Sequence, residues 1–255
     1  MPVHVQRDQP GGVPPLALTG ERTLPDVPAE NYWFRRHLAV YEWIAPRVGA
    51  MRVLDMACGE GYGSAVLAAT AAAVVGVDAN PEAHEHARLR YRASNLRFER
   101  GLVERFRERA DAVVLLQTIE HLQRPAAVLA HLRSLTGERG AVYVSTPNVL
   151  TLAPRGASRS ENPWHVHEYR AEEFRALCRS CFATVEMYGL FHARRLRLHE
   201  HALRLGWDAL HPRLGLTRRF YDWFTPAIAA SDFALRAARG RELDRALDFL
   251  AVCRG

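Results

Sequence analysis

Short apolar runs alternate with amphipathic segments through the middle of the chain. The runs are rich in β-branched residues, which is typical of buried strands, and the segments between them have the length and periodicity of helices. They predict five strands, at Arg52–Cys58, Ala73–Ala79, Leu96–Arg100, Asp111–Thr118 and Gly140–Thr146. The intervening segments predict helices at Tyr62–Thr70, Pro81–Ala93 and Pro125–Thr136. This alternation predicts βαβ units and an α/β fold with helices on both faces of a parallel sheet.

The flanking segments extend this core on both sides. The pattern predicts an aromatic-rich helix at Asn31–Val48, a second helix at Ala171–Ser180, and strands at Ala183–Leu190 and Asp248–Cys253. Residues 192–247 are too many for a hairpin loop, so we expect an inserted cap that is helical around Leu196–Leu205. The predicted organisation is a flexible tail or strap over 1–29, a main domain over 30–191 and 248–255, and a cap over 192–247.

Composition excludes several classes of protein. The 255 residues include 34 basic and 28 acidic side chains, a net charge of +6, and every basic residue is arginine. Without lysine, no Schiff base can hold pyridoxal phosphate and no P-loop lysine can bind a nucleotide phosphate. We expect no membrane span and no secretory leader. Four scattered cysteines do not predict a disulfide framework, and we expect a cytoplasmic protein.

A glycine-rich turn joins the first predicted strand to its helix. The sequence Gly59-Glu60-Gly61-Tyr62-Gly63 allows close approach of a ligand to the backbone. Asp78 ends the next strand, where it would accept hydrogen bonds from ribose hydroxyls. Asp55 precedes the turn, and it would attract a positive amino group but repel a pyrophosphate. The pattern predicts a nucleoside site, and an ordinary dinucleotide-binding oxidoreductase is the alternative.

These motifs resemble those of the class I S-adenosylmethionine-dependent methyltransferases over residues 30–190. Asp55-x-Ala57-x-Gly59-x-Gly61 matches the first motif, with Ala57 where the family commonly has glycine, and Val77-Asp78-Ala79-Asn80 matches the ribose-binding strand end. Asp111–Leu122 and Gly140–Asn148 match the fourth and fifth strands. The sequence is most similar to small-molecule O-methyltransferases of the ubiquinone-biosynthesis and glycan-methylating types.

The resemblance implies a Rossmann-like, seven-stranded methyltransferase sheet with an N-terminal helical cover. It implies S-adenosylmethionine as cofactor and S-adenosylhomocysteine as product. Arg36 of the first helix, in preference to Arg35, is expected to meet the methionine carboxylate, and Gly20–Pro25 is expected as a strap over the pocket or as a loose linker. The residues expected at the cofactor are Arg36, Asp55, Ala57, Gly59, Gly61, Tyr62, Asp78, Ala79, Leu102, Val103 and Gln117.

A polar segment follows the fourth strand, at the edge where open α/β sheets bind ligands. It reads Gln117-Thr-Ile-Glu120-His121. Histidine, with an ordinary pKa of about 6.5, is a suitable base for a hydroxyl nucleophile. We predict His121 as the general base, with Glu120 and His165 as further catalytic candidates; a role for His121 in capping the turn is the alternative.

A second histidine cluster lies downstream, in Asn162-Pro-Trp-His165-Val-His167-Glu-Tyr169. His165 and His167 would point the same way if extended, and with Glu120 and His121 they would form a site for Mg²⁺. Some of the methyltransferases that this sequence resembles use magnesium near a Glu-His pair. In this chain, however, Gln117 stands where a further glutamate would help to bind the ion. The alternative is that both histidines hydrogen-bond the substrate or the backbone. His84 and His86 are expected on a surface helix with structural roles only.

The expected partner is a small acceptor with a hydroxyl group, such as a sugar, glycan or secondary metabolite. Nucleic acid is not favoured, because the Asn/Asp-Pro-Pro-aromatic motif is missing. His192–Arg219 carries seven arginines against Glu200 and Asp208, so the cap would suit an anionic acceptor. An RNA or anionic-lipid methyltransferase and a non-catalytic S-adenosylmethionine-binding protein are the alternatives. A homo-oligomer is compatible with the sequence.

Overall fold

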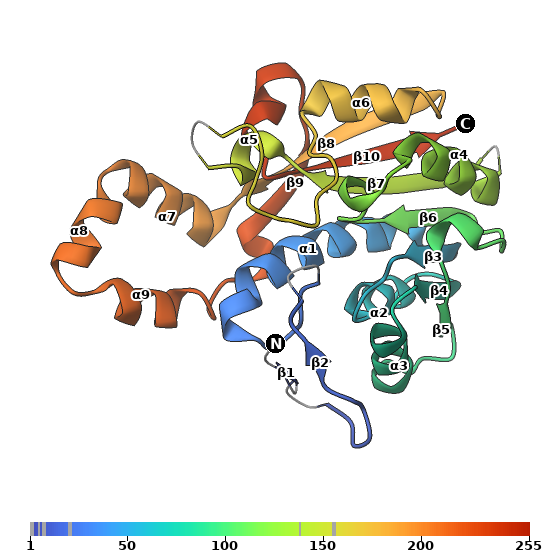
Figure 1. The fold of residues 1–255 in the computed structure, drawn as a ribbon, viewed down its shortest axis with the longest axis horizontal. Coiled ribbons are helices and arrows are strands. Elements are labelled where there is room, and N and C mark those ends of the chain that lie inside the picture. Colours follow the sequence, from blue (N-terminus) through green and yellow to red (C-terminus); the bar gives the residue numbers. More distant parts are fainter. Residues whose placement is uncertain (1–2, 5, 7–8, 20–21, 138, 155–156) are drawn as a thin grey trace.

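One mixed sheet forms the centre of the molecule. The computed structural model describes residues 3–4, 6, 9–19, 22–137, 139–154 and 157–255. Its sheet has eight strands in the order β5-β4-β3-β6-β7-β10-β8-β9 (Figure 1). Five are parallel, namely β3 (Arg52–Met56), β4 (Ala73–Asp78), β5 (Leu96–Arg100), β6 (Ala112–Leu115) and β7 (Ala141–Pro147). The remaining three pair antiparallel, namely β8 (Thr184–His192), β9 (Phe233–Ala237) and β10 (Asp248–Arg254).

The expected seven-stranded sheet is wrong by one strand. β9 lies inside the segment expected to be a cap, and it pairs with β8 at the sheet edge. Its burial falls off along the strand, from buried Phe233 to exposed Ala237. The segment 192–247 therefore contributes both to the sheet and to a separate helical projection.

Helices cover both faces because successive strand residues point to opposite sides. α1 (Asn31–Ile44) and α2 (Tyr62–Ala68) pack with strand residues such as Val53 and Val114 on one face. α4 (Pro125–Thr136) and α6 (Ala171–Arg179) pack with residues such as Leu54 and Val113 on the other. The remaining body elements are α3 (Pro81–Arg90), α5 (Val149–Leu152), β1 (Val3–His4), β2 (Leu16–Ala17), and the 3₁₀ turns η1 (Pro28–Glu30), η2 (Ala45–Val48), η3 (Val103–Arg105), η4 (Ile119–His121), η5 (Ala230–Asp232) and η6 (Gly240–Arg245).

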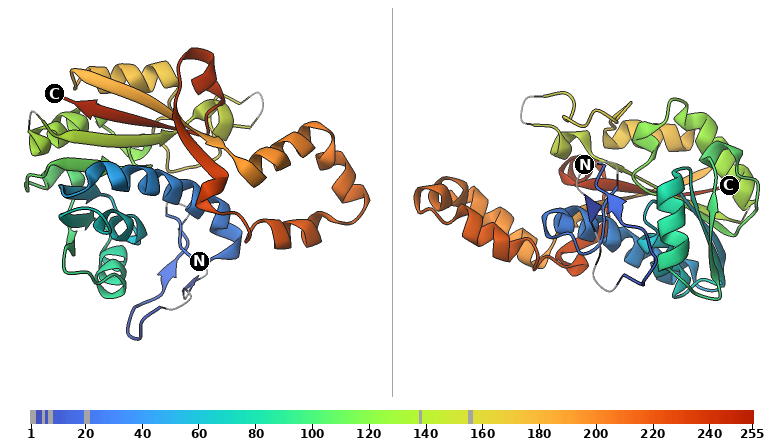
Figure 2. Two further views of the ribbon diagram at one scale, coloured as in Figure 1. Left: turned by 180° about the vertical axis from the view of Figure 1, so that it is seen from behind. Right: turned by 60° about the horizontal axis from the view of Figure 1, so that its bottom comes forward.

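Three helices project from one end of the body, and we call residues 194–224 the arm. They are α7 (Arg194–Arg204), α8 (Trp207–Arg213) and α9 (Thr217–Phe224). Figures 1 and 2 show the arm leaving the body beside the N-terminal end of α1 and returning to it. Within the described parts of the chain, every helix is too short or too polar to cross a bilayer.

The N-terminal segment is partly described. Residues 1–2, 5, 7–8 and 20–21 of the expected flexible tail or strap lie outside the described residues. Leu16, Leu24 and Val27 form a small apolar cluster. The Pro14 carbonyl accepts a hydrogen bond from Nδ1 of His86 at 2.7 Å. His86 is fully buried on the inner side of α3, most of whose other residues are at least partly exposed.

Candidate active site

The glycine-rich turn leaves β3 with a backbone that few side chains tolerate. Ala57, Gly59 and Gly61 all have positive φ, at 56°, 57° and 98°. A Cβ added at Gly61 would lie 2.8 Å from Cβ of Ala87, whereas a Cβ at Gly59 would meet nothing within 4 Å. The turn is therefore packed on its inner side and open above Gly59, as a cradle for a ligand requires.

Asp55 is a fully buried carboxyl below this turn. It accepts a hydrogen bond from Oη of Tyr41 at 3.1 Å and another from Oγ of Ser64 at 2.6 Å. Burial raises its pKa to about 7, although both hydrogen bonds oppose this shift. Among the described residues its two hydrogen-bond donors are neutral hydroxyls, which makes this buried acid suited to an incoming positive group.

Asp78 ends β4 beside the same turn. Its carboxylate accepts hydrogen bonds from the backbone N–H of Gly59 and of Asn80, both at 2.8 Å. Each oxygen keeps a further lone pair for a ribose hydroxyl. The other residues expected at the nucleoside lie at neighbouring strand ends, where Ala79 and Leu102 are exposed and Val103 is buried.

Glu60 anchors the turn through a buried network that the sequence analysis missed. Its carboxylate accepts hydrogen bonds from Nε2 of His86 at 3.1 Å and from Oη of Tyr91 at 2.9 Å. Because His86 also donates to the Pro14 carbonyl, the network ties the N-terminal segment to the turn. No local sequence pattern marks this network, because His86 lies 26 positions from Glu60 and 72 positions from Pro14 along the chain.

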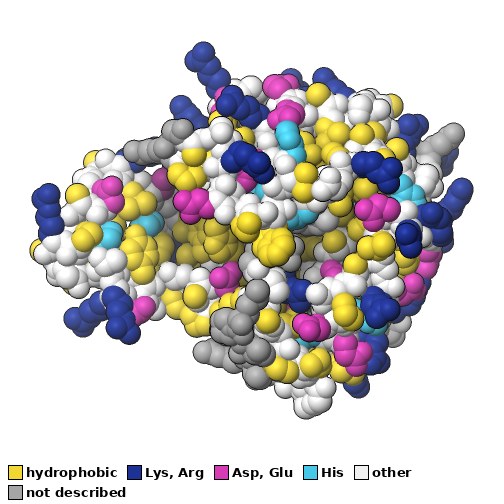
Figure 3. Space-filling model, viewed as in Figure 1, with side chains coloured by type: hydrophobic (Ala, Val, Ile, Leu, Met, Phe, Trp, Pro, Cys, Tyr) yellow, Lys and Arg dark blue, Asp and Glu magenta, His cyan; other side chains and the backbone are white. Residues whose placement is uncertain are grey.

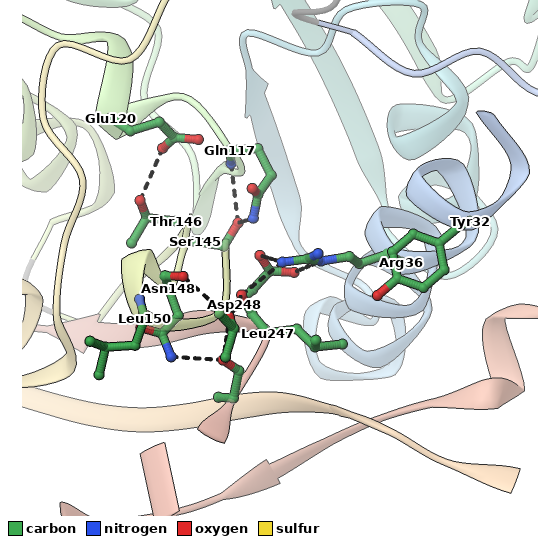
Figure 4. A network of polar contacts seen from close by, with 12 residues as sticks. Tyr32, Arg36, Gln117, Glu120, Ser145, Thr146, Asn148, Leu150, Leu247 and Asp248 are labelled. Carbon is green, nitrogen blue, oxygen red and sulfur yellow. Dashed lines mark hydrogen bonds and ion pairs between the residues drawn. The ribbon is translucent and has the colours of Figure 1, made fainter. Parts of the chain in front are cut away.

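The segment after β6 carries polar side chains that were expected at the cofactor and in catalysis. Gln117 has a φ of 49°, and its backbone N–H and its side-chain Nε2 both donate hydrogen bonds to Oγ of Ser145, each at 3.1 Å. Glu120 is buried and accepts a hydrogen bond from Oγ1 of Thr146 at 3.1 Å (Figure 4). Burial raises the pKa of Glu120 to about 8, so its carboxyl is mostly protonated at neutral pH.

His121 has a defined tautomer. Its Nδ1 lies 3.0 Å from the carbonyl oxygen of Trp164, which only accepts, so Nδ1 carries the proton. Nε2 is then the basic nitrogen, and it lies 4.0 Å from Oε1 of Glu120. The ring of His165 packs edge-on against His121, with ring centroids 5.0 Å apart.

His165 and His167 do not point the same way. His165 is buried and donates from Nδ1 to Glu168 at 2.7 Å, while its Nε2 accepts from Asn162 at 3.0 Å. His167 is partly exposed, and its Nε2 donates to Glu173 at 2.6 Å. Of the four residues expected as metal ligands, Glu120, His121 and His165 thus come together and His167 does not.

These three residues do not fit Mg²⁺. One ligand atom from each lies within 4.8 Å of the others. Magnesium prefers oxygen ligands, but the group supplies one carboxylate and two imidazoles. Both ring nitrogens of His165 already form hydrogen bonds.

A cavity of about 390 Å³ opens over this cluster. Glu120, His121 and His165 line it. Arg22, Thr23, His37 and Gln117 line both this cavity and a second one beside Ala57, Gly59 and Tyr62. The two cavities therefore adjoin, with the glycine-rich turn on one side and the His121 cluster on the other. Gly20 and Glu21 of the expected strap lie outside the described residues.

Arg36 was expected at the methionine carboxylate, but its guanidinium binds an acid of this chain. Its guanidinium forms a buried bidentate pair with Asp248, at 2.7 Å from Nε and 2.6 Å from Nη2, and also donates to the Leu247 carbonyl (Figure 4). It still lines the larger cavity. The pair joins α1 to β10, so Arg36 connects the N-terminal helix to the sheet.

His37 was missed by the sequence analysis although it lines both cavities. Burial lowers its pKa to about 4, so the ring is neutral at neutral pH. His37 lies four residues after Trp33 and four before Tyr41, which places all three on one stripe of α1. Trp33 also lines the larger cavity, and Tyr41 binds Asp55. This spacing is the signal that would have found His37.

The sheet order, the glycine-rich turn and the two acids define a class I S-adenosylmethionine-dependent methyltransferase. Residues 30–199 match the methyltransferase domain family. The chain is 36% identical to a probable S-adenosylmethionine-dependent methyltransferase of Mycobacterium tuberculosis over 98% of this chain and 96% of that protein. The chain belongs to this family, and S-adenosylmethionine is its cofactor.

Two other similarities are more distant. A ubiquinone biosynthesis O-methyltransferase of Aromatoleum aromaticum is 29% identical over 58% of this chain and 72% of that protein. A solved structure from Thermotoga maritima, described as a possible histamine N-methyltransferase, has a TM-score of 0.59 with 12% identity over 89% of this chain and 93% of that one. This structural likeness concerns the fold alone.

Proposed function

We propose that the protein methylates a hydroxyl group of a small acceptor, such as a sugar, glycan or secondary metabolite. The observation that carries this proposal is the His121 tautomer, because the Nδ1 hydrogen bond to Trp164 leaves Nε2 as the basic atom beside the cavity. The likeness to a ubiquinone biosynthesis O-methyltransferase supports oxygen as the accepting atom. The free thiols of all four cysteines support a reducing, cytoplasmic location.

The cofactor residues follow from the turn and its two acids. Asp78 would bind the ribose hydroxyls, and Ala79, Leu102 and Val103 would border the adenine. Asp55 would face the methionine amino group, with the backbone of Ala57 to Gly61 and the Tyr62 ring close by. Gln117, between the two cavities, would lie near the methionine end. Since Arg36 pairs with Asp248, we assign the methionine carboxylate to Arg22, which lines both cavities.

The chemistry requires an aligned hydroxyl and a proton acceptor. S-adenosylmethionine supplies an electrophilic methyl carbon on a sulfonium centre. The acceptor oxygen forms the new bond to this carbon as the carbon–sulfur bond breaks, and the hydroxyl proton passes to Nε2 of His121. As the imidazolium forms, Glu120 would release its own proton to solvent in the cavity, since a neighbouring positive charge lowers the pKa of a carboxyl, and the resulting carboxylate would stabilise the imidazolium. His165 would hold the His121 ring in place.

The substitution His121→Ala tests the assignment of the base. We expect turnover to fall about 10²-fold or more, with S-adenosylhomocysteine affinity unchanged, because the ring removes a proton but does not bind the cofactor. His167→Ala is the matched control, since His167 is a nearby histidine that binds Glu173. Steady-state rates and calorimetric titration measure both effects. Wild-type turnover in His121→Ala would refute the role.

A further inference from the structure

The arm exposes large apolar side chains on several helices. Leu198, Leu205 and Trp223 are 74%, 78% and 67% exposed, and Leu210 and Leu214 are about half exposed. These exposed side chains are not needed to pack the inside of the arm, because Trp207, Phe220 and Phe224 fill its interior. Exposed apolar surface on this scale marks a contact surface rather than a solvated one.

The arm also carries an excess of positive charge. Residues 194–224 contain seven arginines against three acidic residues. Glu200 pairs with Arg204, and Asp222 pairs with Arg218. Five arginines form no ion pair with any described residue, namely Arg194, Arg195, Arg197, Arg213 and Arg219. Figure 3 shows arginine or lysine side chains at the outer edges of the arm, beside hydrophobic ones. Because the chain has no lysine, these are arginines.

We propose that the arm docks on an anionic lipid surface. Amphipathic helices that combine arginine with leucine and tryptophan lie in the membrane interface, with apolar groups in the acyl boundary and cations at the headgroups. An RNA would neutralise the arginines but leave Leu198 and Leu205 without an apolar phase. An isologous pair of arms would bring together two surfaces that each carry a net charge of +4, which is unfavourable. The anionic bilayer satisfies both the charge and the leucines.

The base of the arm is joined to the helix that lines the larger cavity. Nδ2 of Asn31, at the start of α1, donates to the carbonyls of Thr225 at 2.8 Å and Ile228 at 2.9 Å. Oη of Tyr32 lies 2.8 Å from Nε2 of His192. Docking of the arm therefore fixes the orientation of α1 relative to the lipid. The docking itself does not depend on the proposed acceptor or on His121.

Vesicle co-sedimentation of the full chain tests this docking. We expect binding to phosphatidylcholine vesicles that contain phosphatidylglycerol, little binding to pure phosphatidylcholine, and a loss of binding as salt is raised. The double variant Arg213→Gln with Arg219→Gln should bind about 25-fold more weakly, because each arginine near the surface contributes about fivefold. Leu205→Ser with Trp223→Ser should also weaken binding, although it leaves the charge unchanged.

The matched control is Arg92→Gln with Arg109→Gln. Both residues are exposed, lie outside the arm and form no ion pair with described residues. The affinity of this control variant for the anionic vesicles should fall by less than about twofold, since charges beyond a Debye length are screened. Equal binding to both kinds of vesicle, or equal losses in the control and arm variants, would overturn the proposal. So would a dimer in solution that the arm variants dissociate, or tighter binding to polyuridine than to the anionic vesicles.

Discussion

Two buried acids stand at opposite sides of the candidate site. Burial raises the pKa of Asp55 to about 7 and that of Glu120 to about 8. Both acids accept hydrogen bonds from neutral hydroxyl donors, namely Tyr41, Ser64 and Thr146. Each would therefore ionise when a positive charge arrives, from the cofactor at Asp55 and from a protonated His121 at Glu120.

The affinity for S-adenosylhomocysteine should depend on the ionisation of Asp55. Since the proposed contact to the methionine amino group needs the carboxylate, we expect affinity to rise about tenfold from about pH 6 to about pH 8. Asp55→Asn should bind more weakly at the higher pH and lose this dependence. Calorimetric titration over this range measures both. Asp208→Asn, on the exposed surface of the arm, is the control and should behave as the wild type.

Asp55 should also make the free energy of unfolding depend on pH. The unfolded chain ionises Asp55 at about pH 3.8, whereas the folded chain holds the proton until about pH 7. Between these values the folded state binds more protons, so the free energy of unfolding falls as pH rises, and it levels off above the folded pKa. Asp55→Asn should flatten this part of the curve. An unchanged pH dependence of both affinity and stability in Asp55→Asn would contradict the account.

At the scale of elements, α1 and α2 meet through a contact that only glycine permits. A Cβ at Gly63 would lie 2.1 Å from Cζ of Tyr41. Gly63→Ala should therefore push Tyr41 off Asp55 and destabilise the protein by about 1–3 kcal/mol, as overpacking does. Thermal unfolding measures this loss.

Gly49→Ala is the matched control for this packing. Gly49 has an ordinary φ of −53°, and an added Cβ would contact the Pro46 carbonyl at 3.7 Å, a normal distance. We expect it to be neutral or to stabilise the protein by about 0.4–1 kcal/mol. Equal melting temperatures for the two alanine variants would show that the α1–α2 contact is not tight.

The elements that could be predicted from the sequence are those whose signal is local. The first motif places Asp55 and the glycine-rich turn within one strand–turn–helix unit, so its chemistry follows from spacing. β9 was missed because it is a short edge strand with a mostly half-exposed pattern. The pair of Arg36 with Asp248 joins residues 212 positions apart, and the Trp164 carbonyl lies 43 positions from His121. Such contacts depend on the folded topology, which no spacing along the chain encodes.

At the scale of the whole molecule, the arm is built as an appendage. Its interior packs on itself, as His199 stacks on Phe220 and lies 4.7 Å from Phe224 between ring centroids. Its two ends meet at one residue, because the N–H groups of Arg195 and Ala229 both donate to the carboxylate of Asp232 at 3.0 Å. The body therefore holds the ends of the arm together without needing the helices between them.

Replacing residues 197–223 with a short Gly-Ser linker should leave the body folded. Leu196 and Phe224, which pack in the core, remain, and Asp232 still holds both ends. Because the cofactor residues lie outside the arm, we expect affinity for S-adenosylhomocysteine to stay within about twofold of the wild type, as for distant sites that share no partners. Thermal unfolding and calorimetric titration check these two outcomes. Loss of cooperative unfolding would show instead that the arm is part of the folding unit. A folded body that no longer binds cofactor would place part of the cofactor site within the arm.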